Sequence, residues 1–271
     1  MMTNTWSAAS KILVHGHRGA RAMRPENTLP AFEYAIEQGV DCLELDMAVT
    51  KDNVVVVSHD PRMNPAFATG PTAPKAIREM ALDELRLWDV GGKRNSAFPK
   101  QHTVPGTRVP TLDEVLDLST RGSFHFNIET KIFSDRPELT PGPDEFVKLV
   151  LEVIHKHDIG DRVILQSFDF RTLQAMKKVA PQIRLSALLE PGKHDFLEVA
   201  KESGADIISP HQILVTSQNV EQAHQMGLQV VPWTVNTAQD WDKMISAKVD
   251  AIISDDPAAL LAYLKSKGLH S

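Results

Sequence analysis

Residues 40–60 read VDCLELDMAVTKDNVVVVSHD. Two apolar β-type runs, Cys42–Met47 and Val54–Ser58, are separated only by a short polar turn around Asp52. A crossover between parallel strands needs a dozen or more residues, so these two runs must form an antiparallel hairpin. With the turn centred near Asp52, positions whose numbers sum to about 103 or 104 face each other across the hairpin.

Outward from this hairpin, short β-rich runs alternate with amphipathic helical stretches along almost the whole chain. Cys42–Met47 is one of eight predicted strands, and the others are 12–15, 124–129, 163–166, 184–189, 206–209, 228–233 and 251–254. The predicted helices include 82–88, 145–156, 194–203 and 217–227, and Thr111 with Glu114 has capping-box spacing. Eight strands alternating with helices predict an α/β fold, a (β/α)₈ TIM barrel. An open doubly wound sheet is the alternative, but no glycine-rich dinucleotide loop follows the first strand.

One stretch, residues 60–108, interrupts the alternation after the strand that ends in His59 and Asp60. It is rich in Pro, Gly and Asn and too long for an ordinary connection. We therefore predict a single TIM-barrel catalytic domain over 1–271, with 60–108 as an insertion on the C-terminal face of the barrel. We expect this insertion to set specificity.

Composition narrows the class of protein. The chain has 271 residues, a formal net charge of −6 and one cysteine, Cys42. This charge gives no reason to expect nucleic-acid binding, and one cysteine excludes an intrachain disulfide. No apolar run approaches the ~18 residues of a membrane span, and Met1–Ser10 does not resemble a secretion signal, so a cytoplasmic protein is the default expectation. Oligomeric state leaves no trace in the sequence.

Function in a barrel collects at the C-terminal ends of the strands, and charged side chains occupy those ends here. Glu44 and Asp46 share one face of their strand, as residues two apart do, and the hairpin register brings His59 back beside Glu44. The other strand ends add His17, Arg18, Glu129 and Lys131.

Together these residues describe one kind of chemistry. Three carboxylates without cysteine are hard ligands suited to Mg²⁺, Mn²⁺ or Ca²⁺. Arginine and lysine beside them would neutralise a phosphoryl group, and two histidines can divide proton transfer. Each of these motifs alone is more often part of an exposed strand edge or the start of a loop. Because all of them occur at successive strand ends, together they favour metal-assisted phosphoryl transfer to water.

The same residues, with their neighbours, resemble the glycerophosphodiester phosphodiesterase family. The matching motifs, in order, are His17-Arg18-Gly19-Ala20, Pro25-Glu26-Asn27-Thr28, Glu44-Leu45-Asp46, His59-Asp60, Asn127-Ile128-Glu129-Thr130-Lys131, Gln166-Ser167-Phe168, Pro232-Trp233-Thr234-Val235-Asn236 and Ser254-Asp255-Asp256-Pro257. The resemblance covers the chain from about Val14 to Pro257. It departs at Thr130, where the family more often has an aliphatic residue, and Thr130 should point away from the barrel mouth.

The resemblance implies metal-dependent hydrolysis of glycerophosphodiesters to an alcohol and sn-glycerol 3-phosphate. By likeness to the family, one divalent cation, Mg²⁺ or Ca²⁺, would be held by Glu44, Asp46 and Glu129. The same likeness makes His17 and His59 the acid-base pair, Arg18 and Lys131 the phosphate-binding residues, and Trp233 a wall of the alcohol pocket. Phe168 and Gln166 are further pocket candidates. Packing in the core is the alternative for Trp233 and Phe168, and Gln166 could instead belong to a polar layer inside the barrel or contact the site from behind. Glu26 and Asn27 would support the metal ligands.

Two other readings stay open at this point. A lysophospholipid or sphingomyelin substrate would need exposed apolar side chains near the mouth, for which the insertion offers Met63, Phe67, Leu85, Leu87 and Trp88. Leu85 and Trp88 stand at helical spacing, so we expect them to pack the insertion down instead. A barrel that binds its ligand without turnover would have lost a ligand or a histidine, and all seven central residues are present.

Overall fold

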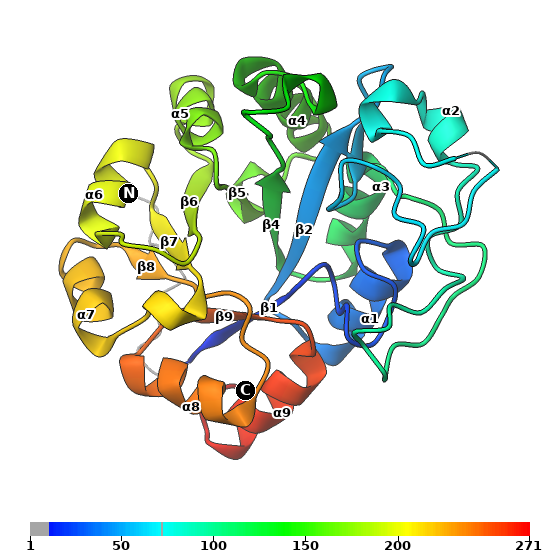
Figure 1. Ribbon diagram of the computed structural model, residues 1–271. Helices are drawn as coiled ribbons and strands as arrows, with labels where there is room; N and C mark the ends of the chain where they lie inside the picture. The colour runs from blue at the N-terminus through cyan, green and yellow to red at the C-terminus, as the bar shows by residue number, and fades with distance from the viewer. Residues whose placement is uncertain (1–10, 72) are drawn as a thin grey trace.

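The computed structural model describes residues 11–71 and 73–271. Within them, eight strands surround a central axis in the order β8-β7-β6-β5-β4-β2-β1-β9, and the paired neighbours are parallel (Figure 1). Their bounds are β1 (Leu13–Gly16), β2 (Cys42–Val49), β4 (His125–Thr130), β5 (Val163–Ser167), β6 (Arg184–Leu189), β7 (Ile207–Pro210), β8 (Gln229–Val230) and β9 (Ala251–Ser254). The segment Met1–Ser10, on which the absence of a secretion signal was predicted, lies outside the described residues.

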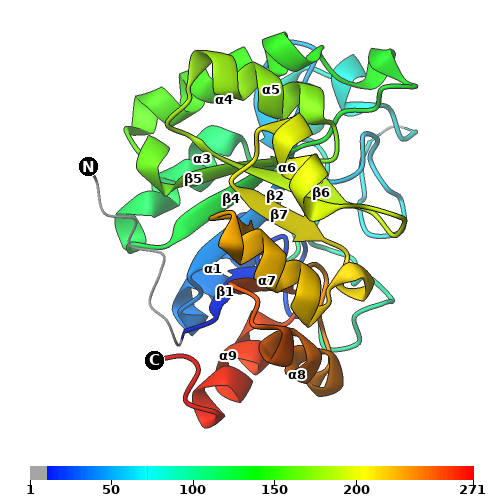
Figure 2. The ribbon, with the colours of Figure 1, turned by 90° about the vertical axis from the view of Figure 1, so that its left-hand side faces the viewer.

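Helices between the strands form the outer layer of the barrel (Figures 1 and 2). They are α1 (Leu29–Gln38), α3 (Leu112–Leu116), α4 (Pro143–His157), α5 (Phe170–Val179), α6 (Phe196–Ser203), α7 (Ser217–Gln225), α8 (Ala238–Ala247) and α9 (Pro257–Ser266). Short 3₁₀ turns add η1 (Ile77–Glu79), η2 (Asp117–Arg121), η3 (Pro137–Leu139), η4 (Gly160–Arg162) and η5 (Gln212–Leu214). This arrangement confirms the predicted (β/α)₈ TIM barrel.

The barrel is nearly closed, and a proline explains where its ladder is incomplete. The strand predicted over 228–233 is regular only over β8, because Pro232 has no backbone N–H to donate. Single bonds still join this segment to β9: the Ile253 amide donates to the Pro232 carbonyl at 3.0 Å, and the Val235 amide to the Ile253 carbonyl at 3.0 Å. With β1 lying between β2 and β9, the strands wrap around rather than form an open doubly wound sheet.

The hairpin has the register that the short turn predicts. Strand β3 (Val55–Val57) pairs antiparallel with β2, with Met47 opposite Val57 and Val49 opposite Val55. The Ser58 amide then donates to the Asp46 carbonyl at 2.9 Å. Residues 58 and 59 are thereby returned to the end of β2 where the acidic side chains lie.

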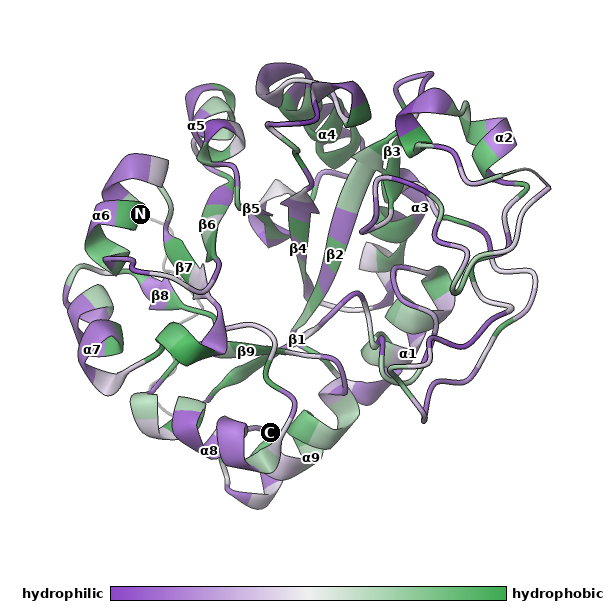
Figure 3. Ribbon diagram, in the orientation of Figure 1, coloured by the Kyte–Doolittle hydropathy of each residue, from purple (hydrophilic) through white to green (hydrophobic). Residues whose placement is uncertain are grey.

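Alternation along the strands separates an apolar layer from a polar one. In β2, Leu43, Leu45 and Met47 belong to the main core between strands and helices, while Glu44 and Asp46 point the other way. A small apolar group that includes Ile164, Ile207 and Val231 fills the barrel interior. Figure 3 shows the resulting polar segments within otherwise hydrophobic strands. The strands therefore bury their acidic side chains inside the barrel.

Local capping fixes the helices near their predicted bounds. The Thr111 hydroxyl accepts from the Glu114 amide at 3.1 Å, and the Glu114 carboxylate accepts from the Thr111 amide at 2.8 Å. This confirms the capping box before α3. Helix α2 (Leu82–Leu85) is shorter than predicted, because the amides of Leu87 and Trp88 bond to carbonyls three residues back rather than four.

The segment 60–108 packs as a layer of its own against the hairpin. Its buried side chains form one apolar cluster with side chains of the hairpin and of the residue that follows the segment. The cluster consists of Ala48, Val56, Met63, Ala68, Ile77, Met80, Leu85, Trp88 and Val109. Leu85 and Trp88 thus hold the segment down, as expected. Near its end, the Gln101 side-chain amide donates to the carbonyls of Arg21 and Arg24 at 2.8 and 3.1 Å. Since those residues follow β1, we propose that 60–108 is an insertion on the C-terminal face of a single domain.

In the described part of the chain, no helix has both the length and the apolar character needed to cross a membrane.

Candidate active site

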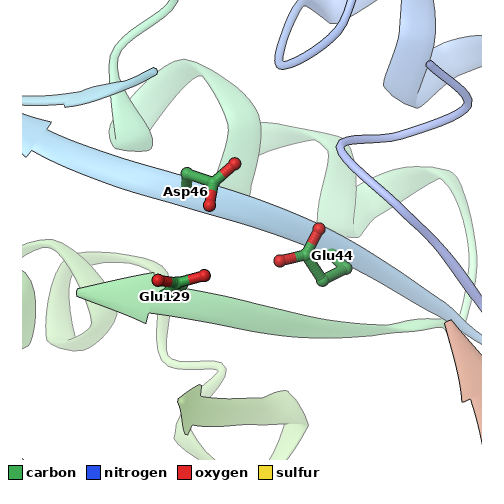
Figure 4. Close-up of side chains that lie close together, drawn as sticks. All are labelled: Glu44, Asp46 and Glu129. Atoms are coloured by element: carbon green, nitrogen blue, oxygen red, sulfur yellow. The ribbon is translucent and has the colours of Figure 1, made fainter. Parts of the chain in front are cut away.

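An acidic triad, Glu44, Asp46 and Glu129, lies where β2 and β4 run side by side. Asp46 is paired in register with Glu129, and Glu44 stands two residues earlier on the same face of β2. One carboxylate oxygen of each residue lies within 4.8 Å of the others, and all three residues are buried (Figure 4). The alternation and the parallel register are thus sufficient to bring the three side chains to one point.

The three carboxylates of this triad are buried and repel one another, which shifts their pKa values. Burial, followed by repulsion from Asp46 and Glu129, raises the pKa of Glu44 well above its usual range. Burial raises the pKa of Glu129 to about 7, with Asp46 adding to the rise against the opposing Lys131. Burial also opposes ionisation of Asp46, but Arg18 and Lys131 hold its pKa well below the usual range. Three hard oxygen donors short of positive charge fit a bound divalent cation of the Mg²⁺ or Ca²⁺ kind.

Arg18 borders the triad from the loop after β1. Its backbone N–H donates to Glu44 Oε2 at 2.9 Å, while its guanidinium reaches Glu26 Oε1 at 2.6 Å and Asp46 Oδ2 at 3.1 Å. Its φ of 50° lies in the left-handed region, which non-glycine residues adopt only where the surroundings require it. Here the carboxylates on three sides of Arg18 supply that requirement.

Lys131 borders the triad from the position directly after β4. Its ammonium Nζ lies 2.9 Å from Glu129 Oε1 and 3.6 Å from Asp46 Oδ1. Thr130, between Glu129 and Lys131, points the other way and shares a 3.0 Å hydrogen bond with the Thr172 hydroxyl, as its place between them implies. Two cationic side chains therefore face the triad from the ends of β1 and β4, the two strands that flank β2.

His17 is held by a residue that the sequence analysis did not assign. Its Nδ1 lies 2.5 Å from Asp255 Oδ1, and its Nε2 lies 3.9 Å from Glu44 Oε2. Asp255 is fixed in turn by Asn236, whose side-chain amide donates to Oδ2 at 2.7 Å. Burial lowers the pKa of His17 against the opposing hydrogen bond of Asp255. Gly16 pairs with Ser254, so His17 and Asp255 follow at the ends of neighbouring strands, a contact that depends on closure of the barrel and that local sequence spacing does not reveal.

His59 has the same kind of partner. Its Nδ1 lies 2.8 Å from Asp60 Oδ1, and the other oxygen of Asp60 accepts from the Asn64 side-chain amide at 2.9 Å. The hydrogen bond from His59, against opposing burial, lowers the pKa of Asp60. Each histidine is thus oriented by a carboxylate at Nδ1, which leaves its Nε2 for other contacts.

Amides orient the triad from behind. The Gln166 side chain donates to Glu44 Oε1 at 2.7 Å and accepts from the Asn127 side-chain amide at 2.9 Å. Asn27 donates to Asp46 Oδ2 at 2.8 Å. Gln166 was predicted as a pocket residue, with a contact from behind the site as one alternative; it lines the cavity and also holds the candidate ligand Glu44 in place. Nothing in the spacing of the sequence could reveal which carboxylate it reaches.

The ten residues predicted as catalytic, phosphate-binding, metal or pocket residues line one cavity of about 240 Å³. They are His17, Arg18, Glu44, Asp46, His59, Glu129, Lys131, Gln166, Phe168 and Trp233. The remaining lining residues, which the sequence analysis did not assign, are Arg21, Leu188, Glu190, Thr234 and Ile253. A TIM barrel with carboxylates, cationic side chains and paired histidines in one mouth defines an enzyme that acts on phosphoric esters.

The chain belongs to the glycerophosphoryl diester phosphodiesterase family, whose sequence profile matches residues 17–259. It is 34% identical to the glycerophosphodiester phosphodiesterase of Caldanaerobacter subterraneus subsp. tengcongensis, over 95% of this chain and 100% of that one. It is 32% identical to the Bacillus altitudinis glycerophosphodiester phosphodiesterase, over 90% of this chain and 94% of that one. The enzyme is accordingly a phosphoric diester hydrolase of the glycerophosphodiester phosphodiesterase class.

Solved structures agree with this assignment. A Silicibacter pomeroyi structure, provisionally assigned as a glycerophosphoryl diester phosphodiesterase, superposes with a TM-score of 0.91 at 30% identity, covering 97% of this chain and 96% of that one. An Oleispira antarctica phosphodiesterase, solved in complex with the product sn-glycerol-3-phosphate, shares the fold with a TM-score of 0.80 at 23% identity, covering 93% and 96%.

Proposed function

We propose that the enzyme hydrolyses glycerophosphodiesters to an alcohol and sn-glycerol 3-phosphate, with a divalent cation held by Glu44, Asp46 and Glu129. The observation that carries this proposal is the buried triad: one oxygen of each residue lies within 4.8 Å of the others, and burial, with added repulsion, raises the pKa of Glu44 and Glu129. When bound, a divalent cation neutralises phosphoryl oxygens and favours attack at phosphorus. The product in the Oleispira relative supports the choice of substrate.

His17 and His59 carry the proton transfers in this proposal. Both are fixed at Nδ1, by Asp255 and Asp60, and both line the cavity. One takes the proton of the attacking oxygen, and the other protonates the leaving alkoxide. Attack by water and attack by the glycerol 2-hydroxyl use the same two groups, so the proposal covers both routes.

Arg18 and Lys131 hold the phosphoryl oxygens in this proposal. Both side chains line the cavity, and both already contact Asp46, so a bound phosphodiester would lie between them and the triad. Charged donors of this kind are worth most where water is excluded, and both side chains are about nine-tenths buried.

A deacylated substrate fits the cavity better than a lysophospholipid. The cavity has a volume of about 240 Å³, which is below the usual volume of pockets that bind drug-sized ligands. Among the apolar candidates of the insertion, Met63, Leu85 and Trp88 are buried, and Leu87 is exposed. None of them lines the cavity among the described residues. The absence of these candidates from the cavity lining supports a deacylated substrate in this proposal.

The test is release of sn-glycerol 3-phosphate from glycerophosphocholine in a coupled assay. We expect activity to vanish after chelation and to return with Mg²⁺, Mn²⁺ or Ca²⁺. Activity that persists in full after chelation would refute the role of the cation. Lysophospholipids serve as the matched substrates. Turnover of lysophospholipids alone would favour a lysophospholipase activity, and ligand binding without any turnover would favour a non-catalytic binding protein.

The cytoplasmic location stays a prediction, which fractionation of the source cells would test.

A further inference from the structure

One wall of the cavity takes no part in the chemistry proposed so far. It consists of Phe168 after β5, Leu188 and Glu190 at the end of β6, and Trp233 with Thr234 after β8. The triad comes from β2 and β4, so this wall belongs to a different part of the barrel. A diester has two sides at phosphorus, and the group that leaves as the alcohol must lie somewhere in the same cavity.

The aromatic part of this wall is held rigidly. The Trp233 indole Nε1 donates to the Ser209 carbonyl at 2.9 Å. Its ring meets Phe168 edge to face at 5.5 Å between centroids and 85°, and meets His211 at 5.2 Å and 90°. The Lys131 ammonium lies 5.9 Å from the centre of the Phe168 ring. One aromatic ring therefore already accepts a cation at this place, and a second is fixed beside it.

Glu190 is the carboxylate of this wall. Among the described residues that line the cavity, it is the one carboxylate outside the triad. Within the described chain, no salt bridge joins its side chain to a cationic group, and its contact with His194 is made by its backbone carbonyl, at 3.0 Å. A negative side chain in a substrate cavity, beside fixed aromatic rings and without a partner of its own, is the usual setting for a cationic ligand group.

The insertion does not compete for this role. The sequence led us to expect that residues 60–108 select the substrate, but no described residue of that segment lines the cavity. Its apolar side chains are instead packed against the hairpin. Selection of the alcohol group therefore falls to side chains that follow the strands themselves.

We propose that Glu190, together with Trp233 and Phe168, forms a subsite for a cationic head group, so that the enzyme prefers glycerophosphocholine and glycerophosphoethanolamine over diesters of uncharged alcohols. This inference rests on the proposed function, because it assigns the second half of the same substrate. The carboxylate supplies charge, and the two rings supply the faces on which a quaternary or primary ammonium packs. Glu190 is thus a specificity residue, whose loss changes substrate choice rather than the chemical step.

The test compares kcat/KM for glycerophosphocholine and for glycerophosphoglycerol in the cation-saturated enzyme. In Glu190→Gln we expect the ratio of the two values to fall by about threefold to fivefold, since partly exposed charge pairs have modest strength. The fall should come from KM for the choline substrate, with kcat unchanged. Glu190→Lys should lower the ratio further. Glu202→Gln, which removes an exposed carboxylate from α6 outside the cavity, is the matched control and should keep the native ratio.

Ionic strength gives a readout that a structural role for Glu190 would not change. Raising salt from about 50 to about 500 mM should lower the ratio of the native enzyme and leave that of Glu190→Gln unaltered. An active enzyme whose ratio is the same in the native protein and in Glu190→Gln would overturn this subsite alone. Absence of turnover of every glycerophosphodiester by the native enzyme would remove the proposed function and the subsite with it.

Discussion

Acidic side chains lie at both rims of the barrel, partly buried at the N-terminal rim and fully buried at the C-terminal rim, and the two rims stabilise their charges differently. At the N-terminal rim, Asp41, Asp206 and Asp250 each come just before a strand, and each accepts a hydrogen bond from a backbone N–H of the strand beside it. The donors are Val14 at 2.9 Å, Leu185 at 3.0 Å and Val230 at 2.7 Å. At the C-terminal rim, three carboxylates instead face one another.

The pKa values follow this difference. At the N-terminal rim, burial alone would raise the pKa of Asp41, but hydrogen bonds from His270 and the Val14 amide, with the Lys11 charge, bring it below its usual value. At the C-terminal rim, burial, with Asp46 adding to it against the opposing Lys131, raises the pKa of Glu129 to about 7. A fold can thus stabilise a partly buried carboxylate such as Asp41 by hydrogen bonds at one end and leave fully buried ones short of positive charge at the other, where a bound cation would complete the balance.

The largest expected effect is a difference in enzyme activity between substitutions at the two rims. We expect His17→Ala to lower kcat by roughly 10²- to 10⁴-fold, because it removes a proton-transfer group at the C-terminal rim. His270→Ala, at the N-terminal rim, is the matched control and should leave kcat unchanged while it lowers the melting temperature. Steady-state assays and circular dichroism measure the two quantities. Equal loss of turnover in both variants would break the division between the rims.

The second largest effect should be a difference between the two rims in how a bound cation changes the stability of the protein. At a cation concentration of about 100 times its Kd, we expect the native protein to gain about 2.7 kcal/mol of stability, because only the folded state assembles the triad. Asp46→Asn should lose most of this gain, whereas Asp206→Asn at the other rim should retain it. Thermal melts with and without Mg²⁺ or Ca²⁺ measure the difference. A gain of the same size in Asp46→Asn would place the cation elsewhere.

The smallest effect concerns stability in acid. A carboxyl group whose folded pKa lies below its unfolded value stabilises the protein above the unfolded pKa, and this contribution is lost as pH falls through the folded value. We therefore expect Asp41→Asn to cost about 1–2 kcal/mol near neutral pH, with the difference from the native protein shrinking as pH falls below about 4. Urea unfolding across pH checks this. A difference that stays constant across that pH range would contradict the assignment to Asp41.

The positions of the triad were predictable because two simple rules suffice for them. Residues two apart share a face of a strand, and strand ends in a parallel barrel meet at one rim. The hairpin register was predictable because its turn is short. By contrast, the His17 to Asp255 contact requires knowing that β1 and β9 are neighbours, which only the closed barrel fixes. The shortening of β8 at Pro232 could have been foreseen from the missing N–H.

Other features depend on packing that no local pattern encodes. The amide of Gln166 reaches Glu44 because of its side-chain rotamer, not its place in the sequence. The insertion was expected to contribute to substrate choice, yet Ile77, Met80 and Trp88 are directed into a layer against the hairpin. Apolar side chains scattered through a loop-rich segment serve a core or a binding surface equally well in sequence, and only the folded chain distinguishes the two.

The carboxylate of Asp41 has a consequence for engineering, since it holds both ends of the described chain. Lys11 Nζ lies 3.1 Å from one of its oxygens, His270 Nε2 lies 2.8 Å from the other, and the Ile12 amide donates to the Leu269 carbonyl at 3.0 Å. Figure 2 shows the C-terminus on the side of the barrel away from the insertion loops. A short linker from residue 271 to residue 11 would therefore give a circular permutant, with new termini opened in the exposed stretch around Lys93.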